Sequence, residues 1–371
     1  MPDIDLSSLN TQILWASFAL SVIFGAVAQR THFCTMGAVG DILNIGDWAR
    51  MRMWVLAIGV AVIGFNLMVA AHWVDGGKTF YAQARLPWLS IILGGLMFGI
   101  GMSLASGCGS KTVVRIGGGN LKSLLVFIVM AVAALSTMRG ILGVWRQQWI
   151  DPVAIVLPTT QDLPSLISHY SGQPKIMVAF MLALLLGGGL VAWSLGRQEG
   201  RSRDVLLGGL GIGAVVLGLW WVSGVWGHLE EHPETLEEVF LATNSRRMES
   251  FTFVGPVAYL LDWITYASDK SKAITLGIVT VPGVMIGSCL VAVLSGTFRW
   301  EGFRGTEDMV NHMLGGALMG IGGVMALGCT IGQGLSGVST LSVGSLLAFA
   351  SLMVGAVLGL RYQAWRIERM I

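Results

Sequence analysis

The sequence predicts an all-α integral membrane protein with about nine transmembrane helices, four short re-entrant helices and two inverted, pseudo-symmetric repeats. Three observations predict this fold. Of the 371 residues, 54% are hydrophobic and only 12% are charged, whereas soluble domains are about a quarter charged. Apolar stretches long enough to cross a bilayer recur along the whole chain. A long segment of the first half also recurs in the second half.

Nine apolar stretches are expected to span the membrane, because a spanning helix needs about 20 mostly apolar residues. The 51 glycines fit this assignment, since glycine is enriched where membrane helices pack closely or are interrupted. The predicted spans are residues 13–29, 53–72, 88–106, 122–144, 176–196, 205–226, 273–297, 312–328 and 343–361.

Four segments between these spans are too short, too glycine-rich or too interrupted to cross a bilayer. Irregular backbone at membrane depth persists only where it is buried in protein or lines a cavity. We therefore expect four re-entrant half-helices, at residues 33–46, 108–119, 250–264 and 329–341.

The distribution of charge predicts an outer N-terminus and an inner C-terminus. Residues 1–12 are acidic and polar, so no cleavable signal is expected and residues 13–29 form a retained first span. With this threading, more of the 23 lysines and arginines fall inside than outside, as positive residues do in membrane proteins.

Two pairs of segments indicate an internal duplication. LGGLMFGIGMSLASGC at 93–108 aligns without a gap with LGGALMGIGGVMALGC at 314–329. FCTMGAVGDIL at 33–43 matches FTFVGPVAYLL at 251–261 at nearly the same offset. The threading makes the two halves inverted repeats, and transporters built in this way place the substrate site at the midplane, where helices are broken.

The repeat also divides the chain. We treat residues 1–371 as a single membrane domain, with a first repeat at 13–146 and a second repeat at 205–371. A connecting region with one span lies between them, at 147–204.

Three of the four cysteines stand at the predicted helix breaks. Cys108 and Cys329 close the two copies of the repeated segment, and Cys34 opens the first re-entrant segment, where the second copy has Thr252. The wide spacing argues against a disulfide framework. A buried free cysteine is usually a small hydrophobic residue, and we keep that interpretation for Cys289, which has no counterpart.

A helix that begins after a glycine-rich break exposes unpaired N–H groups with partial positive charge, and these suit a small anion. A neutral thiol adds a weak, polarizable donor, which matches a soft sulfur atom. The predicted substrate-binding residues are Cys34, Cys108, Cys329, Gly107, Gly109, Gly328 and Thr330. Lys111, Arg115 and Arg30 are expected to add positive charge at the inner end.

Other chemistries lack their motifs. The GGGN at 117–120 lacks the GxxxxGK[ST] spacing of a phosphate-binding loop, so we interpret it as a turn and expect no ATP hydrolysis by this chain. The net charge of +2 and the absence of a basic run give no indication of nucleic-acid binding. No enzymatic activity, cofactor or bound metal is expected.

Three motifs carry a resemblance to the YeeE/YedE family of sulfur-compound transporters. They are QRTHFCTMGAVGD at 29–41, SGCGSKTVVRIGGGNLKS at 106–123 and LGCTIGQGL at 327–335, and the resemblance covers both halves of the chain. It implies an hourglass-shaped bundle in a bacterial inner membrane. It also implies that thiosulfate passes from thiol to thiol along Cys34, Cys108 and Cys329, and that a soluble TusA-like sulfur carrier is a partner.

Three alternatives stay open. The second motif is more basic and closer to a branch associated with selenium, which predicts uptake of a selenium compound or another sulfur oxyanion. A membrane thiol oxidoreductase would relay electrons through the three cysteines, but it needs cysteines paired at short spacing. A metal permease would use the thiols as soft ligands, although few histidines or carboxylates lie nearby in the sequence.

Overall fold

The protein is a bundle of helices, as the sequence predicts. The computed structural model describes residues 6–233, 235–269, 271–303 and 305–369. Strands occur in the described ranges only as two small antiparallel pairs outside the bundle. These are β1 (Arg85–Leu86) with β2 (Ile155–Val156), and β3 (His228–Leu229) with β4 (Val239–Phe240).

Eight helical segments of the described chain are long and apolar enough to cross a membrane. They lie on α1 (Leu6–Thr31), α3 (Ala49–Ala70), α4 (Trp88–Leu104), α6 (Leu121–Arg139), α9–η2–α10 (Lys175–Leu182, Ala183–Gly187, Gly188–Leu195), α11–η4 (Arg203–Trp221, Val222–Trp226), α13 (Leu276–Leu294) and α15 (Val343–Glu368).

The one remaining predicted span, 312–328, falls on helix α14 (Thr306–Met325). This helix has Glu307 and Asp308 in its first turn, which lowers its mean hydropathy. It nevertheless packs against both α4 and α6 inside the bundle.

All four predicted re-entrant segments are short helices. Three are α2 (Thr35–Ile45), α5 (Gly109–Gly117) and α12 (Val254–Thr265). The fourth covers residues 330–339 and contains the π-helical turn η5 (Gly332–Gly337).

The predicted end of one span is wrong. The apolar pattern extends to residue 144, but α6 stops at Arg139 because Gly140 adopts an extended conformation and starts a separate helix. The sequence pattern also did not predict the short elements outside the spans. These are α7 (Ile141–Trp149), α8 (Leu163–Ser171), η1 (Gly76–Lys78) and η3 (Gln198–Arg201).

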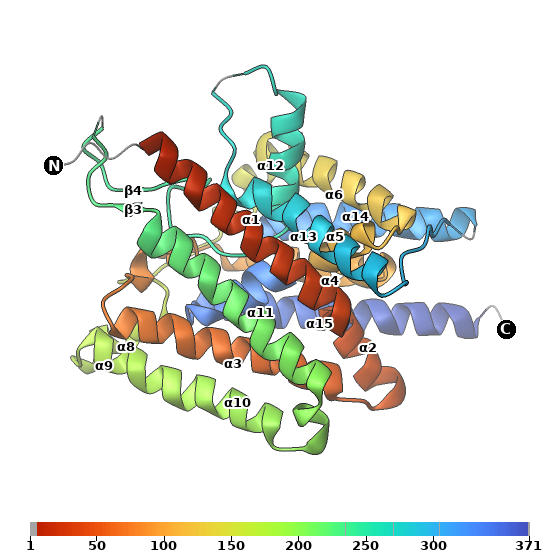
Figure 1. Ribbon diagram of the computed structural model, residues 1–371, viewed down its shortest axis with the longest axis horizontal. Helices are drawn as coiled ribbons and strands as arrows, with labels where there is room; N and C mark the ends of the chain where they lie inside the picture. The colour runs from red at the N-terminus through yellow and green to blue at the C-terminus, as the bar shows by residue number, and fades with distance from the viewer. Residues whose placement is uncertain (1–5, 234, 270, 304, 370–371) are drawn as a thin grey trace.

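Long helices of the first half pack against long helices of the second half. Helix α1 packs on α13, and α3 packs on α11, while α4 packs on α14 and α15. Figure 1 shows α1 and α11 side by side, with α9 and α10 along the outer edge next to α3. Crossed pairs of this kind are expected if the two halves are related by a duplication, and the inverted relation itself stays a prediction.

The crossing of α1 and α13 brings two backbones into contact. A Cβ atom on Gly25 would lie 2.2 Å from the Val284 carbonyl oxygen, and one on Gly287 would lie 1.9 Å from the Val22 carbonyl oxygen. Small residues allow this close approach in membrane helices, where van der Waals packing drives association.

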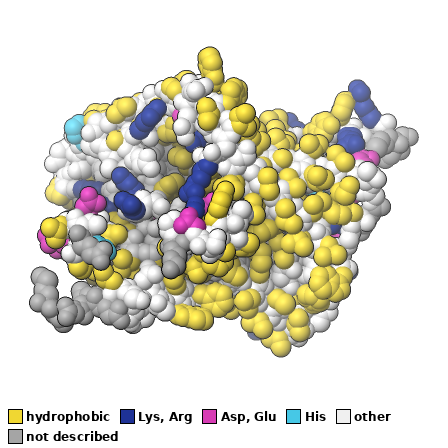
Figure 2. Space-filling model, turned by 90° about the horizontal axis from the view of Figure 1, so that it is seen from above, with side chains coloured by type: hydrophobic (Ala, Val, Ile, Leu, Met, Phe, Trp, Pro, Cys, Tyr) yellow, Lys and Arg dark blue, Asp and Glu magenta, His cyan; other side chains and the backbone are white. Residues whose placement is uncertain are grey.

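The outer surface of the bundle is apolar. Figure 2 shows hydrophobic side chains spread over the right half of this face, with charged side chains gathered mainly in the left half. Leu185 and Leu294 are 72% and 85% exposed. Such a broad apolar surface is typical of contact with lipid, and the chain is a multi-pass membrane protein.

The substitution Gly287→Ala is expected to lower the stability of the detergent-solubilised protein by about 1–3 kcal/mol, because its methyl group meets the α1 backbone. Gly188→Ala is the matched control, since no atom of another segment lies within 4 Å of its Cβ position, and it should be neutral or slightly stabilising. Thermal unfolding of both variants checks this, and an unchanged melting temperature for Gly287→Ala would contradict it.

Candidate functional site

The backbone before three cysteines adopts one repeated conformation. The residue two positions earlier has a left-handed φ angle of 53° at His32, 56° at Ser106 and 59° at Leu327. Non-glycine residues rarely adopt this conformation. Its occurrence three times at the same place before a cysteine indicates a structural requirement of the site.

The helix that precedes each of these cysteines ends with the same type of backbone hydrogen bond. The residue just before each cysteine donates its N–H to a carbonyl five residues back, which is the pattern of a Schellman helix end. The bonds are Phe33 N–H to Ala28 O (3.1 Å), Gly107 N–H to Met102 O (2.8 Å) and Gly328 N–H to Gly323 O (2.8 Å).

Each cysteine then begins a new helix. Cys34 is the N-cap of α2 and Cys108 is the N-cap of α5, both with extended backbone, and Cys329 directly precedes the helix at 330–339. The Cys34 sulfur accepts the N–H of Gly37 at 3.3 Å, and the Cys329 sulfur accepts the N–H of Gly332 at 3.4 Å. The thiols therefore lie at helix ends with partial positive charge.

Tertiary packing brings the three thiols together. The Cys34 and Cys108 thiols lie within hydrogen-bonding reach of each other, and Cys329 lies close enough to Cys108 to interact electrostatically. Their exposed fractions are 8%, 1% and 0% for Cys34, Cys108 and Cys329. Cys289 lies on α13 and is partly exposed. The three predicted cysteines form one buried row.

Unpartnered hydroxyl groups accompany this row. The Thr35 and Thr330 hydroxyls, each one residue after a cysteine, are buried and have no hydrogen-bond partner among the described residues. The Thr330 hydroxyl lies beside the Cys108 thiol. Buried polar groups in proteins are normally paired, so these donors are available to a ligand.

The predicted glycines shape the turns around the thiols. A Cβ atom on Gly107 would lie 3.3 Å from the Lys111 side chain, and one on Gly328 would lie 3.1 Å from the Gln333 side chain. Gly109 starts α5 next to Met130. Gly107 and Gly328 thus leave room for the side chains of the following helix.

A basic cavity of about 730 Å³ lies at one end of the row, which is the predicted inner end. Lys111 and Arg115 line it, and Lys111 acts electrostatically on Cys34. Arg30 is not among its lining residues, because this side chain is 63% exposed and approaches Asp204 at 3.8 Å. The other lining residues include His32, Lys122, Arg299, Glu301 and Asp308.

Arg50 is a residue that sequence reasoning missed. Its Nη1 atom would lie 2.7 Å from a Cβ atom on Gly37, while its Nε atom bonds to Asp41 at 3.1 Å. The guanidinium group therefore covers the first turn of α2, beside the Cys34 thiol. The sequence motif around Cys34 does not indicate this contact, because Arg50 lies on another helix, after the turn at Gly46.

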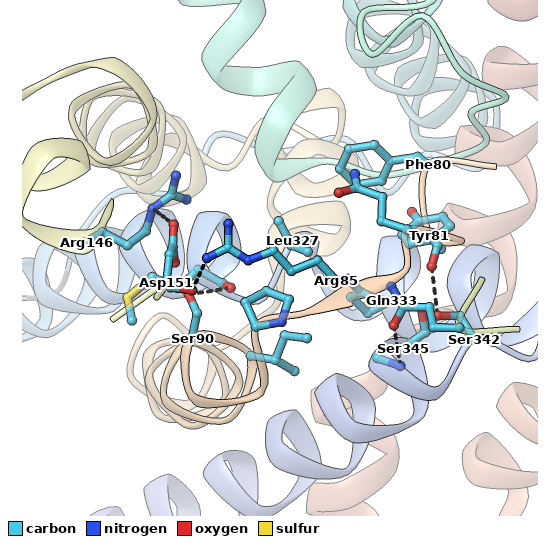
Figure 3. A pocket seen from close by; sticks show the side chains of 16 residues that line it. Phe80, Tyr81, Arg85, Ser90, Arg146, Asp151, Leu327, Gln333, Ser342 and Ser345 are labelled. Atoms are coloured by element: carbon cyan, nitrogen blue, oxygen red, sulfur yellow. Dashed lines mark hydrogen bonds and ion pairs between the residues drawn. The ribbon is translucent and has the colours of Figure 1, made fainter. Parts of the chain in front are cut away.

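Two adjoining cavities lie at the other end of the row. One has a volume of about 170 Å³ and the other about 280 Å³, and they share Phe80, Tyr81, Arg146 and Leu327. Figure 3 shows Arg85, Arg146 and Asp151 on one side of the first cavity, opposite Tyr81, Gln333 and Ser342.

Tyr81 joins these cavities to the thiols. A Cβ atom on Gly332 would lie 3.4 Å from the Tyr81 hydroxyl and 2.4 Å from the Thr252 hydroxyl, so both hydroxyls meet the first turn after Cys329. Tyr81 lies in a connecting segment outside the repeated motifs. The only available signal was the pairing of Thr252 with Cys34 in the duplicated motif.

Metal-binding geometry is lacking over the part of the chain that the structure describes. Nowhere in these ranges do three histidine, cysteine, aspartate or glutamate side chains gather in a way that could hold a metal ion.

Comparison with known proteins gives a matching family and two named relatives. Residues 30–358 match the model of a family described as "Sulphur transport". The thiosulfate transporter TsuA of Escherichia coli (strain K12) is 27% identical over 325 residues, which is 84% of each chain. The thiosulfate transporter TsuA of Spirochaeta thermophila is 24% identical over 352 residues, covering 92% of this chain and 97% of the relative. The family and both relatives are transporters.

Four free thiols are expected in the purified protein, because all four cysteines are unpaired. Alkylation in denaturant, read by mass spectrometry, should modify all four cysteines equally with and without prior reduction. A gain of two modified cysteines on reduction would reveal a disulfide, contradict this arrangement and favour the oxidoreductase alternative.

Proposed function

This chain belongs to the sulphur transport family, and we propose that it imports thiosulfate through the row formed by Cys34, Cys108 and Cys329. The membrane is proposed to be the bacterial inner membrane, with the N-terminus outside and the C-terminus in the cytoplasm. The names of both relatives support the substrate. The observation that carries the route is a buried row of three thiols at helix N-termini between two sets of cavities.

The physical basis of the route is replacement of water. A dianion that enters a narrow apolar passage loses its hydration, and that loss is costly unless other donors replace it. N–H groups at the start of three helices provide partial positive charge without a counter-ion. Neutral thiols add soft donors, and a thiolate would repel the substrate.

We place the steps in the following order. The anion enters the cavities beside Arg146 and Tyr81, meets Cys329 and Thr330, and passes to Cys108 and then to Cys34. It leaves through the basic cavity lined by Lys111 and Arg115. Positive charge on the wall raises the local concentration of an anion.

Inward movement of a dianion needs a driving force. Moving charge against a membrane potential costs about 2.3 kcal/mol per charge per 100 mV. Removal of the product on the inner side meets part of this cost, and we propose a soluble TusA-like sulfur carrier in that role.

A selenium compound or another sulfur oxyanion is the second candidate. Lys111 and Arg115 of the more basic motif both line the inner cavity, and this charge would serve related anions equally well. Competition of selenite, sulfite and sulfate against labelled thiosulfate separates the candidates. Stronger competition by selenite than by unlabelled thiosulfate would replace the first substrate with the second.

Cys108→Ala and Cys329→Ala are expected to reduce thiosulfate uptake by about 10- to 100-fold, since hydrogen bonds to a charged group contribute about 1.5–3 kcal/mol. Uptake of labelled thiosulfate by cells that lack their own importers measures the effect, and immunoblots of membranes report the amount of protein. Cys289→Ala is the control and should transport normally. Normal uptake by both test variants would exclude a role for the thiols.

Lys111→Gln is expected to raise the KM for thiosulfate several-fold at low ionic strength and less at high ionic strength, because salt screens the charge. Arg203→Gln removes an exposed charge outside the lining of the basic cavity and should leave the KM unchanged. Uptake kinetics at two salt concentrations check this. A KM that changes equally at both concentrations would indicate a structural effect.

A further inference from the structure

The larger of the two adjoining cavities beside Tyr81, which lies on the outer side in the proposed orientation, contains one carboxyl group that has no cation as partner among the described residues. Glu249 lines this cavity of about 280 Å³ together with Tyr81 and Thr252. One oxygen of its side chain accepts the N–H of Ser245 at 2.7 Å. Among the residues that the structure describes, Glu249 takes part in no ion pair.

Two other acidic side chains near the cavity, by contrast, form ion pairs. Asp262 bonds to Arg139 at 3.0 Å and to Lys272 at 2.7 Å, and Asp151 bonds to Arg146 at 3.2 Å. The two arginines of the cavity are therefore already paired. A charged Glu249 would place a negative charge without a partner where the proposed dianion must enter.

The charged, titratable and hydrogen-bonding groups that line the cavity together with Glu249 come from several elements. They are Arg139 on α6, Arg146 on α7, Tyr259 on α12, Tyr81 from the 79–84 segment, and Asn244 and Ser245 of its own loop. The two cations have acidic partners and the rest are neutral donors. Burial raises the pKa of the Glu249 carboxyl above its usual value, although hydrogen bonds from Ser245 and Asn244 oppose this effect. The protonated form therefore persists to higher pH than in an exposed glutamate.

We propose that Glu249 is a proton-linked binding residue, whose neutral carboxyl group donates an O–H hydrogen bond to the sulfur-containing dianion in the outer cavity. This inference rests on the proposed transport of thiosulfate. The proton stays on the carboxyl group while the anion is bound, and no covalent bond is made or broken. Tyr81 lies within electrostatic range of both Glu249 and Cys329, so the anion passes from the carboxyl group toward the first thiol.

The sign of the pH dependence of the KM follows from the coupling between proton binding at Glu249 and anion binding. An anion that binds only the protonated carboxyl group binds more weakly as the pH rises through the pKa of Glu249. Above that pKa the protonated fraction falls about tenfold per pH unit. The KM should rise by the same factor, while the maximal rate changes little.

Uptake kinetics of labelled thiosulfate into vesicles that contain the purified full-length protein test the proposal. With the external pH varied between about 5 and 8, the wild type should show the rising KM. Glu249→Gln keeps a neutral N–H donor, so its KM should stay low and independent of pH. Glu231→Gln removes an exposed charge from the preceding loop and should follow the wild type.

The outcomes separate the two proposals. A Glu249→Gln variant with the wild-type pH profile overturns the role of Glu249, and so does a wild-type KM that is constant over this range. The wild-type profile decides even if the variant fails to insert. Absence of thiosulfate uptake by the wild type at every pH would instead overturn the proposed function.

Discussion

The structure depends on one constraint, which is that the chain must stop and restart a helix inside the bundle without leaving its backbone unsatisfied. Each of the three breaks solves this with a left-handed residue, a bond back to the old helix and a cysteine that begins the next one. The first N–H groups of the new helix remain without intrahelical partners. In water they would be hydrated, but here they face buried thiols.

Because of this constraint, the geometry of the site depends on the close packing of the long helices. Short helices can end at the centre only if the long helices around them approach closely, as at the crossing of α1 and α13, where Gly25 and Gly287 allow the backbones to touch. The same surroundings keep the thiols buried, and a buried thiol beside an anion is stable only in its neutral form. In the proposed route, neutral thiols and helix N-termini therefore hold the anion without counter-ions that would trap it.

The cavities at the two ends of the row of thiols differ in their charged groups. The basic cavity carries an excess of basic groups, among which Lys111 has no ion pair over the described residues. At the other end Arg139 and Arg146 are paired with acids, whereas Glu249 takes part in no ion pair among the described residues. In the proposed route, attraction is therefore strongest at the predicted exit, whereas passage through the cavity of Glu249 depends on neutral donors and on the protonation of one carboxyl group.

The sequence alone determined the fold class, the long helices and the breaks before Cys34, Cys108 and Cys329, because apolar length and glycine-rich interruptions are local properties. It missed the end of α6 at Gly140 and the positions of Arg50, Tyr81 and Glu249, which lie outside the repeated motifs, in the first turn of a helix or in connecting segments. Only the tertiary structure decided that the three thiols form one row, that Arg30 lies outside the basic cavity and that Glu249 has no ion pair within the described part of the chain. These facts depend on contacts between segments far apart in the chain, and no local pattern encodes such contacts.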